Sequence, residues 1–206
     1  MNKKIKTFIV GSFVLLSSCS SNQKESLTAI EELHQITDRV AFENKCKLAM
    51  GYNALDEHKL ALKLRSPYSS NLLPGKILFD YYQLAIRGEK IDITKYVLFD
   101  QNDNELYSLS IDDLEHITYR VNATKFSLEE DYSNLYNLLD TSITNHVEAN
   151  DFNRKMSKFI PNDVKFSGFQ LVDSMLGIGF KNSMKEIVFI YKWKSQRNKL
   201  YGISIE

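Results

Sequence analysis

Cysteine is scarce in this chain of 206 residues, which contains only Cys19 and Cys46. A surplus of charge is missing as well, since 26 Lys and Arg residues balance 26 Asp and Glu residues. Binding to the phosphates of a nucleic acid rewards an excess of cations. The balance therefore argues against a nucleic-acid partner, more strongly so because residues 1–18 carry three of the lysines and the remainder is mildly acidic.

The amino terminus lacks a hydrophobic run long enough to cross a membrane. Its apolar stretch, TFIVGSFVLL at residues 7–16, is about half as long as the roughly 20 residues that a transmembrane helix needs. Basic residues precede it in MNKKIK, an order typical of a secretory signal with a charged region followed by an apolar region. We therefore expect a signal segment and no permanent transmembrane anchor.

The residues after the apolar stretch, Leu16-Ser17-Ser18-Cys19, resemble the lipobox of bacterial lipoproteins. The resemblance covers residues 1–19. It implies diacylglycerol on the thiol of Cys19, cleavage between Ser18 and Cys19, and acylation of the new amino group by a chain such as palmitate. Two or three acyl chains make a stable anchor, whereas one holds only marginally. The alternative is an ordinary cleaved signal, although Leu16 does not fit the small residue that an A-x-A site requires.

The same resemblance implies the cellular location of the protein and the organisation of the chain. It divides the sequence into a signal peptide at residues 1–18, a lipidated tether at 19–26 and a single globular domain at 27–206. The mature protein is then expected in the bacterial cell envelope, facing the periplasm or the cell surface. Ser20 follows the cysteine, and in Gram-negative bacteria a residue other than Asp there implies sorting to the outer membrane.

The part of the domain before its C-terminal quarter has mainly helical patterns. Apolar spacings of three and four predict a long amphipathic helix from Leu27 to the stop at Ser66-Pro67, with a break near Gly51. A second helix is expected over residues 76–88, ended by Gly88. The stretch KYVLFDQNDNELYSLSI, at residues 95–111, predicts a β-hairpin with a polar turn.

Two capping boxes mark the expected starts of further helices. Ser110 with Asp113, and Ser127 with Glu130, each place a hydroxyl three residues before an acid that can hydrogen-bond back to the cap. A helix is therefore expected to begin at each serine.

From residue 163 the apolar period changes to two, which predicts strands. The alternation loses its parity at Gly168, where we expect a β-bulge. The predicted fold is α+β, with helices packed on a small antiparallel sheet and a C-terminal β-meander. The last stretch, YKWKSQRNKLYGISIE, resembles the final hairpin of NTF2-like cone folds, while the long helical stretches before it depart from the order of that family.

Familiar catalytic and metal-binding motifs are lacking. The four histidines, His34, His58, His116 and His146, have no H-x-x-x-H or H-x-H spacing, and the acids near His58 and His116 are typical of solvated helix surface. The turn DQNDNE lacks the glycine and the final glutamate of a calcium loop. Nucleophile elbows and phosphate loops are absent too. We expect no metal and no cofactor, and Cys46 as a buried inert thiol rather than a reactive one.

Two features remain as a candidate binding patch. Gly177 and Gly179 lie on a predicted strand, where they allow either close packing of another element or the approach of a ligand. Basic residues with one aromatic residue follow at Lys192, Trp193, Lys194 and Arg197. They either protect a sheet edge or contact anionic glycans, lipid headgroups or an acidic partner.

These patterns predict a non-catalytic lipoprotein, attached to a membrane by its lipid, that binds or scaffolds another component of the envelope. A more specific version is an immunity or inhibitor protein that neutralises a toxin. The alternative from another class is a carrier or enzyme with a cone-like domain that binds a small ligand between its helices and its sheet.

Overall fold

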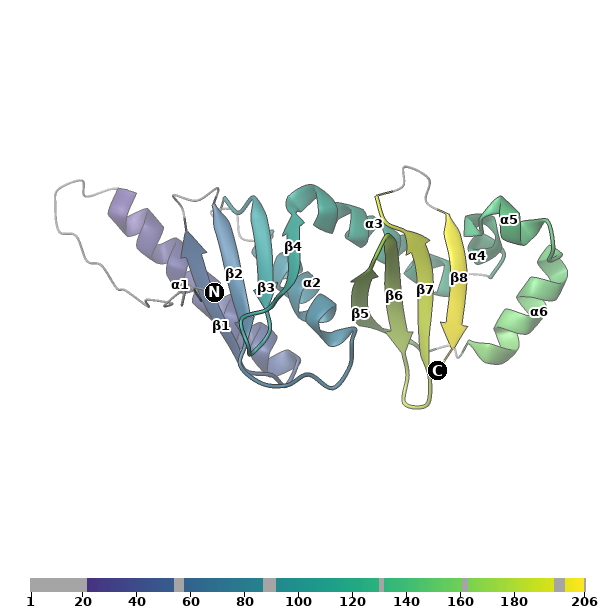
Figure 1. Cartoon of the computed structure of the whole chain (residues 1–206), viewed down its shortest axis with the longest axis horizontal. Helices are drawn as coiled ribbons and strands as arrows, with labels where there is room; N and C mark the ends of the chain where they lie inside the picture. The colour runs from purple at the N-terminus through teal and green to yellow at the C-terminus, as the bar shows by residue number, and fades with distance from the viewer. Residues whose placement is uncertain are drawn as a thin grey trace, which may run out of the picture.

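A computed structural model describes residues 22–53, 58–86, 92–129, 132–160, 163–194 and 199–205. The predicted lipobox, Gly88 and Arg197 lie outside this described part of the chain. Within it there are six helices and two four-stranded sheets, so the predicted α+β class is confirmed. Figure 1 shows the two sheets in front and helices α1, α2 and α3 behind them.

The elements follow one another in a mixed order. The helices are α1 (Asn22–Glu43), α2 (Leu73–Ala85), α3 (Ile111–Glu129), α4 (Tyr132–Leu138), α5 (Thr141–Thr144) and α6 (Ala149–Phe159). The strands are β1 (Leu48–Asn53), β2 (Lys59–Leu64), β3 (Lys95–Phe99), β4 (Glu105–Ser110), β5 (Lys165–Val172), β6 (Met175–Lys181), β7 (Glu186–Lys192) and β8 (Leu200–Ile205).

The long helix predicted from Leu27 is wrong beyond Glu43, because the chain turns there and forms β1 and β2. In β2 the side chains of Leu60, Leu62 and Leu64 are buried, while the residues between them are only half-buried. That alternation with period two belongs to a strand with one covered face. Helix α1 also begins earlier than expected, at Asn22, since the Gln, Lys and Glu of the predicted tether are good helix formers.

The first sheet has the order β1-β2-β3-β4 and was not predicted as a whole, although its β3–β4 hairpin was. Strands β2 and β3 run parallel, with α2 in the connection between them, while the other two pairs are antiparallel. Helices α1 and α2 cover one face. The opposite face, which we call the open face, carries the half-buried side chains of β2.

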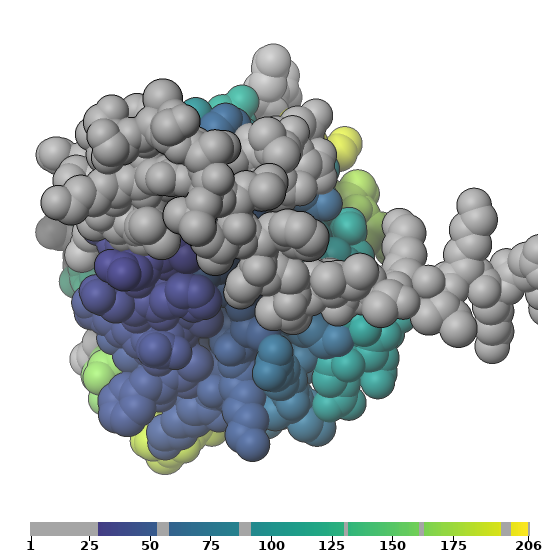
Figure 2. Space-filling view, turned by 90° about the vertical axis from the view of Figure 1, so that its left-hand side faces the viewer, coloured from purple at the N-terminus to yellow at the C-terminus, as the bar shows by residue number. Residues whose placement is uncertain are grey.

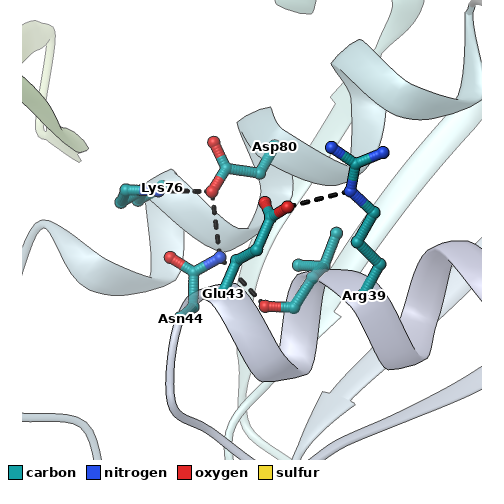
Figure 3. Close-up of polar contacts among 6 residues, drawn as sticks. Arg39, Glu43, Asn44, Lys76 and Asp80 are labelled. Atoms are coloured by element: carbon teal, nitrogen blue, oxygen red, sulfur yellow. Dashed lines mark hydrogen bonds and ion pairs between the residues drawn. The ribbon is translucent and has the colours of Figure 1, made fainter.

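Buried polar contacts join α1 to α2. The hydroxyl of Tyr81 donates a hydrogen bond of 2.9 Å to the carbonyl of Leu33 and lies 3.2 Å from the hydroxyl of Thr37. Figure 3 shows Asp80 of α2 next to Lys76 and to Asn44, whose side-chain amide donates to Asp80 at 2.9 Å. Figure 2 shows the end of the molecule where α1, in purple, lies beside the blue strands.

The second sheet is an antiparallel meander in the order β5-β6-β7-β8, as predicted. The expected bulge is confirmed, because the register shifts between Phe166 and Gly168 and Gly168 has a φ of 137°. One face is continuously apolar and includes Leu176, Ile178 and Phe180, all buried. Helix α3 lies against this sheet through a hydrogen bond of 2.6 Å between the hydroxyls of Thr124 and Tyr191.

One of the two predicted capping boxes is present. The amide of Asp113 donates to the hydroxyl of Ser110 at 3.2 Å, and the amide of Ser110 donates to the carboxylate of Asp113 at 3.1 Å. The second is wrong, because Ser127 lies inside α3 and its hydroxyl donates to the carbonyl of Ala123. A serine that bonds back to a carbonyl one turn earlier fits a helix interior, and Glu130 lies outside the described residues.

Helix α2 also packs on the edge strand of the second sheet. A Cβ atom on Gly75 would meet the carbonyl oxygen of Phe169 at 2.0 Å, so only glycine allows this approach. The rings of Phe79 and Phe166 are 4.8 Å apart, and the hydroxyl of Tyr107 donates to the same carbonyl of Phe169 at 3.2 Å. One hydrophobic cluster therefore includes residues from both sheets.

Candidate functional site

The structure separates the predicted binding patch into two parts. Gly177 and Gly179 lie in the middle of β6, on the face opposite the continuous apolar one. A Cβ atom on Gly179 would meet Cδ1 of Leu72 at 2.3 Å, so this glycine admits the loop that leads into α2. The expectation that another element packs closely over the sheet is thus confirmed for Gly179.

Gly177 lies beside a hollow of about 370 Å³. The loop over residues 68–72 forms one wall, and Gln170, Glu186 and Val188 form the other. Hydroxyl and amide groups predominate in this lining, with one carboxylate. The hydroxyl of Ser70 already accepts a hydrogen bond from the amide of Leu72 at 3.2 Å. Such a lining provides donors and acceptors for a polar ligand or a polar protein surface.

The basic part of the patch lies at the end of β7, next to the start of α3. Nζ of Lys194 is 3.1 Å from Oδ1 of Asp113, and the Trp193 ring packs edge-on against His116 with 6.1 Å between centroids. One turn further along α3, Nη1 of Arg120 donates to the carbonyl of Lys192 at 3.0 Å. The predicted lysines and tryptophan thus meet a row of polar residues on a helix.

Sequence reasoning missed this row, which consists of Asp113, His116 and Arg120. Their spacing of three and four places them on one face of α3, a signal that was present in the sequence. The helix surface around His116 was expected to be solvated, but Nε2 of His116 is buried and has no hydrogen-bond partner among the residues that the structure describes. The side chain of Arg120 is fully buried, with its guanidinium 5.3 Å from the centre of the Tyr191 ring.

The electrostatics of this row favour a neutral histidine between two charged groups. Burial lowers the pKa of His116, the cation of Arg120 lowers it further, and the carboxylate of Asp113 opposes them. Burial alone would raise the pKa of Asp113, but hydrogen bonds from Ser110 and the charge of Lys194 outweigh it and the pKa is lowered. Burial also raises the pKa of Tyr191 to about 12. Through the contacts of Asp113 with Lys194 and of Arg120 with the carbonyl of Lys192, the row joins α3 to the end of β7.

A second hollow, of about 440 Å³, lies on the open face of the first sheet. Its floor consists of the small residues Ala49, Gly51 and Ala61. Lys63, which is ion-paired with Asp103, stands on its rim together with Arg65 and Phe99. The sequence did not indicate this hollow, because its floor and rim come from separate strands.

The remaining candidate residues from the sequence, Asp100, Cys46 and His58, have surroundings typical of structural residues. The carboxylate of Asp100 accepts from the backbone amides of Asn102 and Asn104 at 2.8 and 2.9 Å, as expected of a plain hairpin turn. Cys46 is half-buried after α1, and burial raises the pKa of its thiol. His58 lies in a turn rather than on a helix, with Nδ1 3.0 Å from the hydroxyl of Tyr52.

Neither a metal-binding cluster nor a membrane-spanning helix occurs in the part of the chain that the structure describes. In this part of the chain no group of three or more His, Cys, Asp or Glu side chains is placed to hold a metal ion. Across the same residues, none of the helices is both long and apolar enough to span a membrane.

Comparison with known proteins adds no relative. The chain matches no family model, no curated protein and no solved structure.

Proposed function

We propose that this protein is a lipid-anchored lipoprotein of the bacterial cell envelope, and that its domain binds or scaffolds another envelope component without catalysis. One observation carries the proposal, namely the order of the amino-terminal signals. The basic MNKKIK, the apolar residues 7–16 and the sequence Leu16-Ser17-Ser18-Cys19 follow one another at the spacing of a lipoprotein signal.

The start of α1 is consistent with a domain held close to a membrane. Helix α1 begins at Asn22, so only residues 20 and 21 would separate it from an acylated Cys19. Two residues span at most about 7 Å even when fully extended. A domain on so short a link would lie against the lipid surface, where its partners would also have to be.

The two hollows support a binding role. The one beside Gly177 offers hydroxyl and amide groups from the loop over residues 68–72 and from Gln170. The one on the open face offers a small-residue floor with charged and aromatic residues on its rim. Both are surface depressions with mixed lining, which suit recognition of another surface.

Metabolic labelling with a fatty-acid analogue tests the anchor. The wild-type protein and Cys46→Ala, which keeps the lipobox cysteine, should both incorporate the label. Cys19→Ala should incorporate none and should leave the membrane fraction. Equal labelling of Cys19→Ala and wild type would refute the lipid anchor, and the Cys46→Ala control excludes an effect of merely losing a thiol.

Site-specific photocrosslinking tests the binding role. A photoreactive residue at Gln170 reports on the hollow beside Gly177, and one at Asn150, exposed on α6, serves as the matched control. We expect a discrete crosslinked envelope component from position 170 only. The same products from both positions, or none from position 170, would contradict a binding role for the hollow beside Gly177.

A further inference from the structure

Two exposed apolar side chains lie together where α6 ends. Met184, at the tip of the hairpin between β6 and β7, exposes 83% of its surface, and Phe159, the last residue of α6, exposes 47%. Both line a hollow of about 260 Å³ with the buried Ile160. Figure 1 places α6 at the opposite end of the molecule from α1.

Lys158 and Lys185 line the same hollow as these apolar residues, and no acid among the described residues lines it. Lys155 and Lys181 are further lysines on the same two elements, and Glu186 follows Lys185 and lies opposite Lys181 in the β6–β7 register. All four lysines are exposed, and none forms an ion pair with any residue that the structure describes. Nζ of Lys185 lies 5.9 Å from the centre of the Phe159 ring, so cation and apolar groups share one surface.

Stabilisation of the fold explains only part of this arrangement. Lys158 is in the last turn of α6, where a cation complements the carbonyl end of the helix. Lys181 lies opposite Glu186 in the β6–β7 register, where opposite charges favour the pairing of the strands. Lys185 lies in the hairpin, where no helix end requires a cation. The exposed Met184 contributes little to the core, because most of its surface faces solvent.

We infer that the end of α6 and the β6–β7 hairpin form a contact with an anionic phospholipid membrane. We call this surface the α6–hairpin patch, and it consists of Lys158, Phe159, Met184 and Lys185. Interfacial binding combines apolar side chains inserted at the headgroup boundary with lysines attracted to anionic lipid. The patch supplies both, on adjacent elements.

A membrane fits the patch better than an acidic protein does. A stable protein–protein interface buries about 800 Å² on each partner around a well-packed apolar centre. The α6–hairpin patch offers two apolar side chains and an open hollow, which is little for such an interface. A fluid lipid surface needs no shape complementarity, so a few apolar groups and several cations suffice.

With the proposed lipid anchor, the patch would give the molecule a second attachment. An acylated Cys19 would hold the α1 end, and the α6–hairpin patch would hold the other end, so the long axis would lie along the bilayer (Figure 1). This orientation rests on the proposed function. The affinity of the patch for anionic lipid does not, and it can be measured without any acyl chain.

Vesicle binding of an unacylated protein tests the inference. The mature chain, residues 19–206 with Cys19→Ala, is mixed with vesicles of phosphatidylcholine alone or of phosphatidylcholine and phosphatidylglycerol in equal parts, and sedimented. We expect binding only to vesicles with phosphatidylglycerol, and less of it at high salt. In Lys158→Glu/Lys185→Glu the partition should fall by roughly tenfold or more, given the attraction of each lysine.

The control variant Lys45→Glu/Lys47→Glu changes the net charge equally at two exposed positions after α1 and should bind as the parent does. Circular dichroism checks that each variant is folded. Met184→Ser, which removes an exposed side chain, should also weaken binding and needs no change of charge. Absence of binding to anionic vesicles, equal loss in both charge-reversed variants, or capture of an acidic protein without lipid binding would overturn the inference. Fatty-acid labelling tests the lipid anchor and vesicle binding tests the α6–hairpin patch. Each proposal can therefore fail without the other.

Discussion

The carbonyl oxygen of Leu72 lies 2.0 Å from the position that a Cβ atom on Gly168 would occupy. A mirror relationship holds between Gly75 and the carbonyl of Phe169. The first turn of α2 and the bulge in β5 therefore touch backbone to backbone, with a glycine on each side. This contact fixes where the helix sits on the edge of the second sheet.

Replacing Gly168 should be costly. Gly168→Ala places a methyl group against a backbone carbonyl at a φ of 137°, which L-residues rarely adopt. Steric displacement and backbone strain should together lower the free energy of unfolding by about 3 kcal/mol. Urea denaturation measures the change. Gly51→Ala is the matched control, because nothing lies within 4 Å of its Cβ position, and it should change stability by less than about 1 kcal/mol. Similar losses in both variants would contradict the contact.

The two ion pairs on the helices should contribute differently to the free energy of unfolding. Asp80→Ala removes the acceptor of Lys76 and one of the two acceptors of the Asn44 amide, which keeps the carbonyl of Val40, at a site where the Asp80 side chain is only 19% exposed. A loss of about 1–3 kcal/mol is expected. Glu43→Ala removes the exposed pair with Arg39, which should matter by less than about 0.5 kcal/mol. Chemical denaturation of both variants tests the ranking, and a larger loss in Glu43→Ala would show it to be wrong.

His116 should make stability depend on pH. Its pKa is lowered in the fold, chiefly by burial and then by Arg120, so the unfolded chain binds the proton more tightly, at an ordinary pKa of about 6.5. Stability is then complete above that pH and is lost as the pH falls from about 6.5 toward the folded pKa. Asp113, whose pKa is also lowered, acts in a separate window below about pH 4.

The measurement compares unfolding free energies near pH 7.5 and pH 5 for the wild type and His116→Gln. Between pH 7.5 and pH 5 the free energy of unfolding should fall less in the variant, because the glutamine at position 116 cannot be protonated. Parallel losses in the two proteins would rule out His116 as the source.

Cys46 should react slowly in the folded protein. Burial raises the pKa of its thiol, so less thiolate is present and access is reduced. In the mature chain with Cys19→Ala it is the remaining cysteine, and its alkylation near pH 8 can be followed alone. We expect a rate at least about tenfold lower than in concentrated urea. Equal rates with and without urea would indicate a reactive, accessible thiol.

Local signals predicted local structure well. The capping box of Ser110 and Asp113 and the bulge at Gly168 depend on a few neighbouring residues, and both were found where expected. The second box failed because the same spacing from Ser127 occurs inside a helix, where the hydroxyl bonds back to Ala123. A motif of two residues does not distinguish a helix start from a helix interior.

The first sheet was missed because its pattern has two readings. Leu48, Tyr52 and Leu55 follow one another at spacings of four and three, as in a helix, whereas Leu60, Leu62 and Leu64 alternate with period two, as in a strand. Pairing of β2 with the distant β3 decides between them. The spacing of the polar row on α3 could be seen in the sequence, but its contacts could not, because that of Arg120 with the carbonyl of Lys192 joins residues 72 positions apart.

Helix α2 limits where this chain could be cut into separately folding fragments, whether by evolution or in the laboratory. It covers the first sheet and also packs, through Gly75, against the edge strand of the second. A cut between the sheets would leave each fragment with a bare apolar surface where the helix or its seat had been. We therefore expect recombination, duplication or domain swapping to yield a folded product only when residues 22–205 are transferred together.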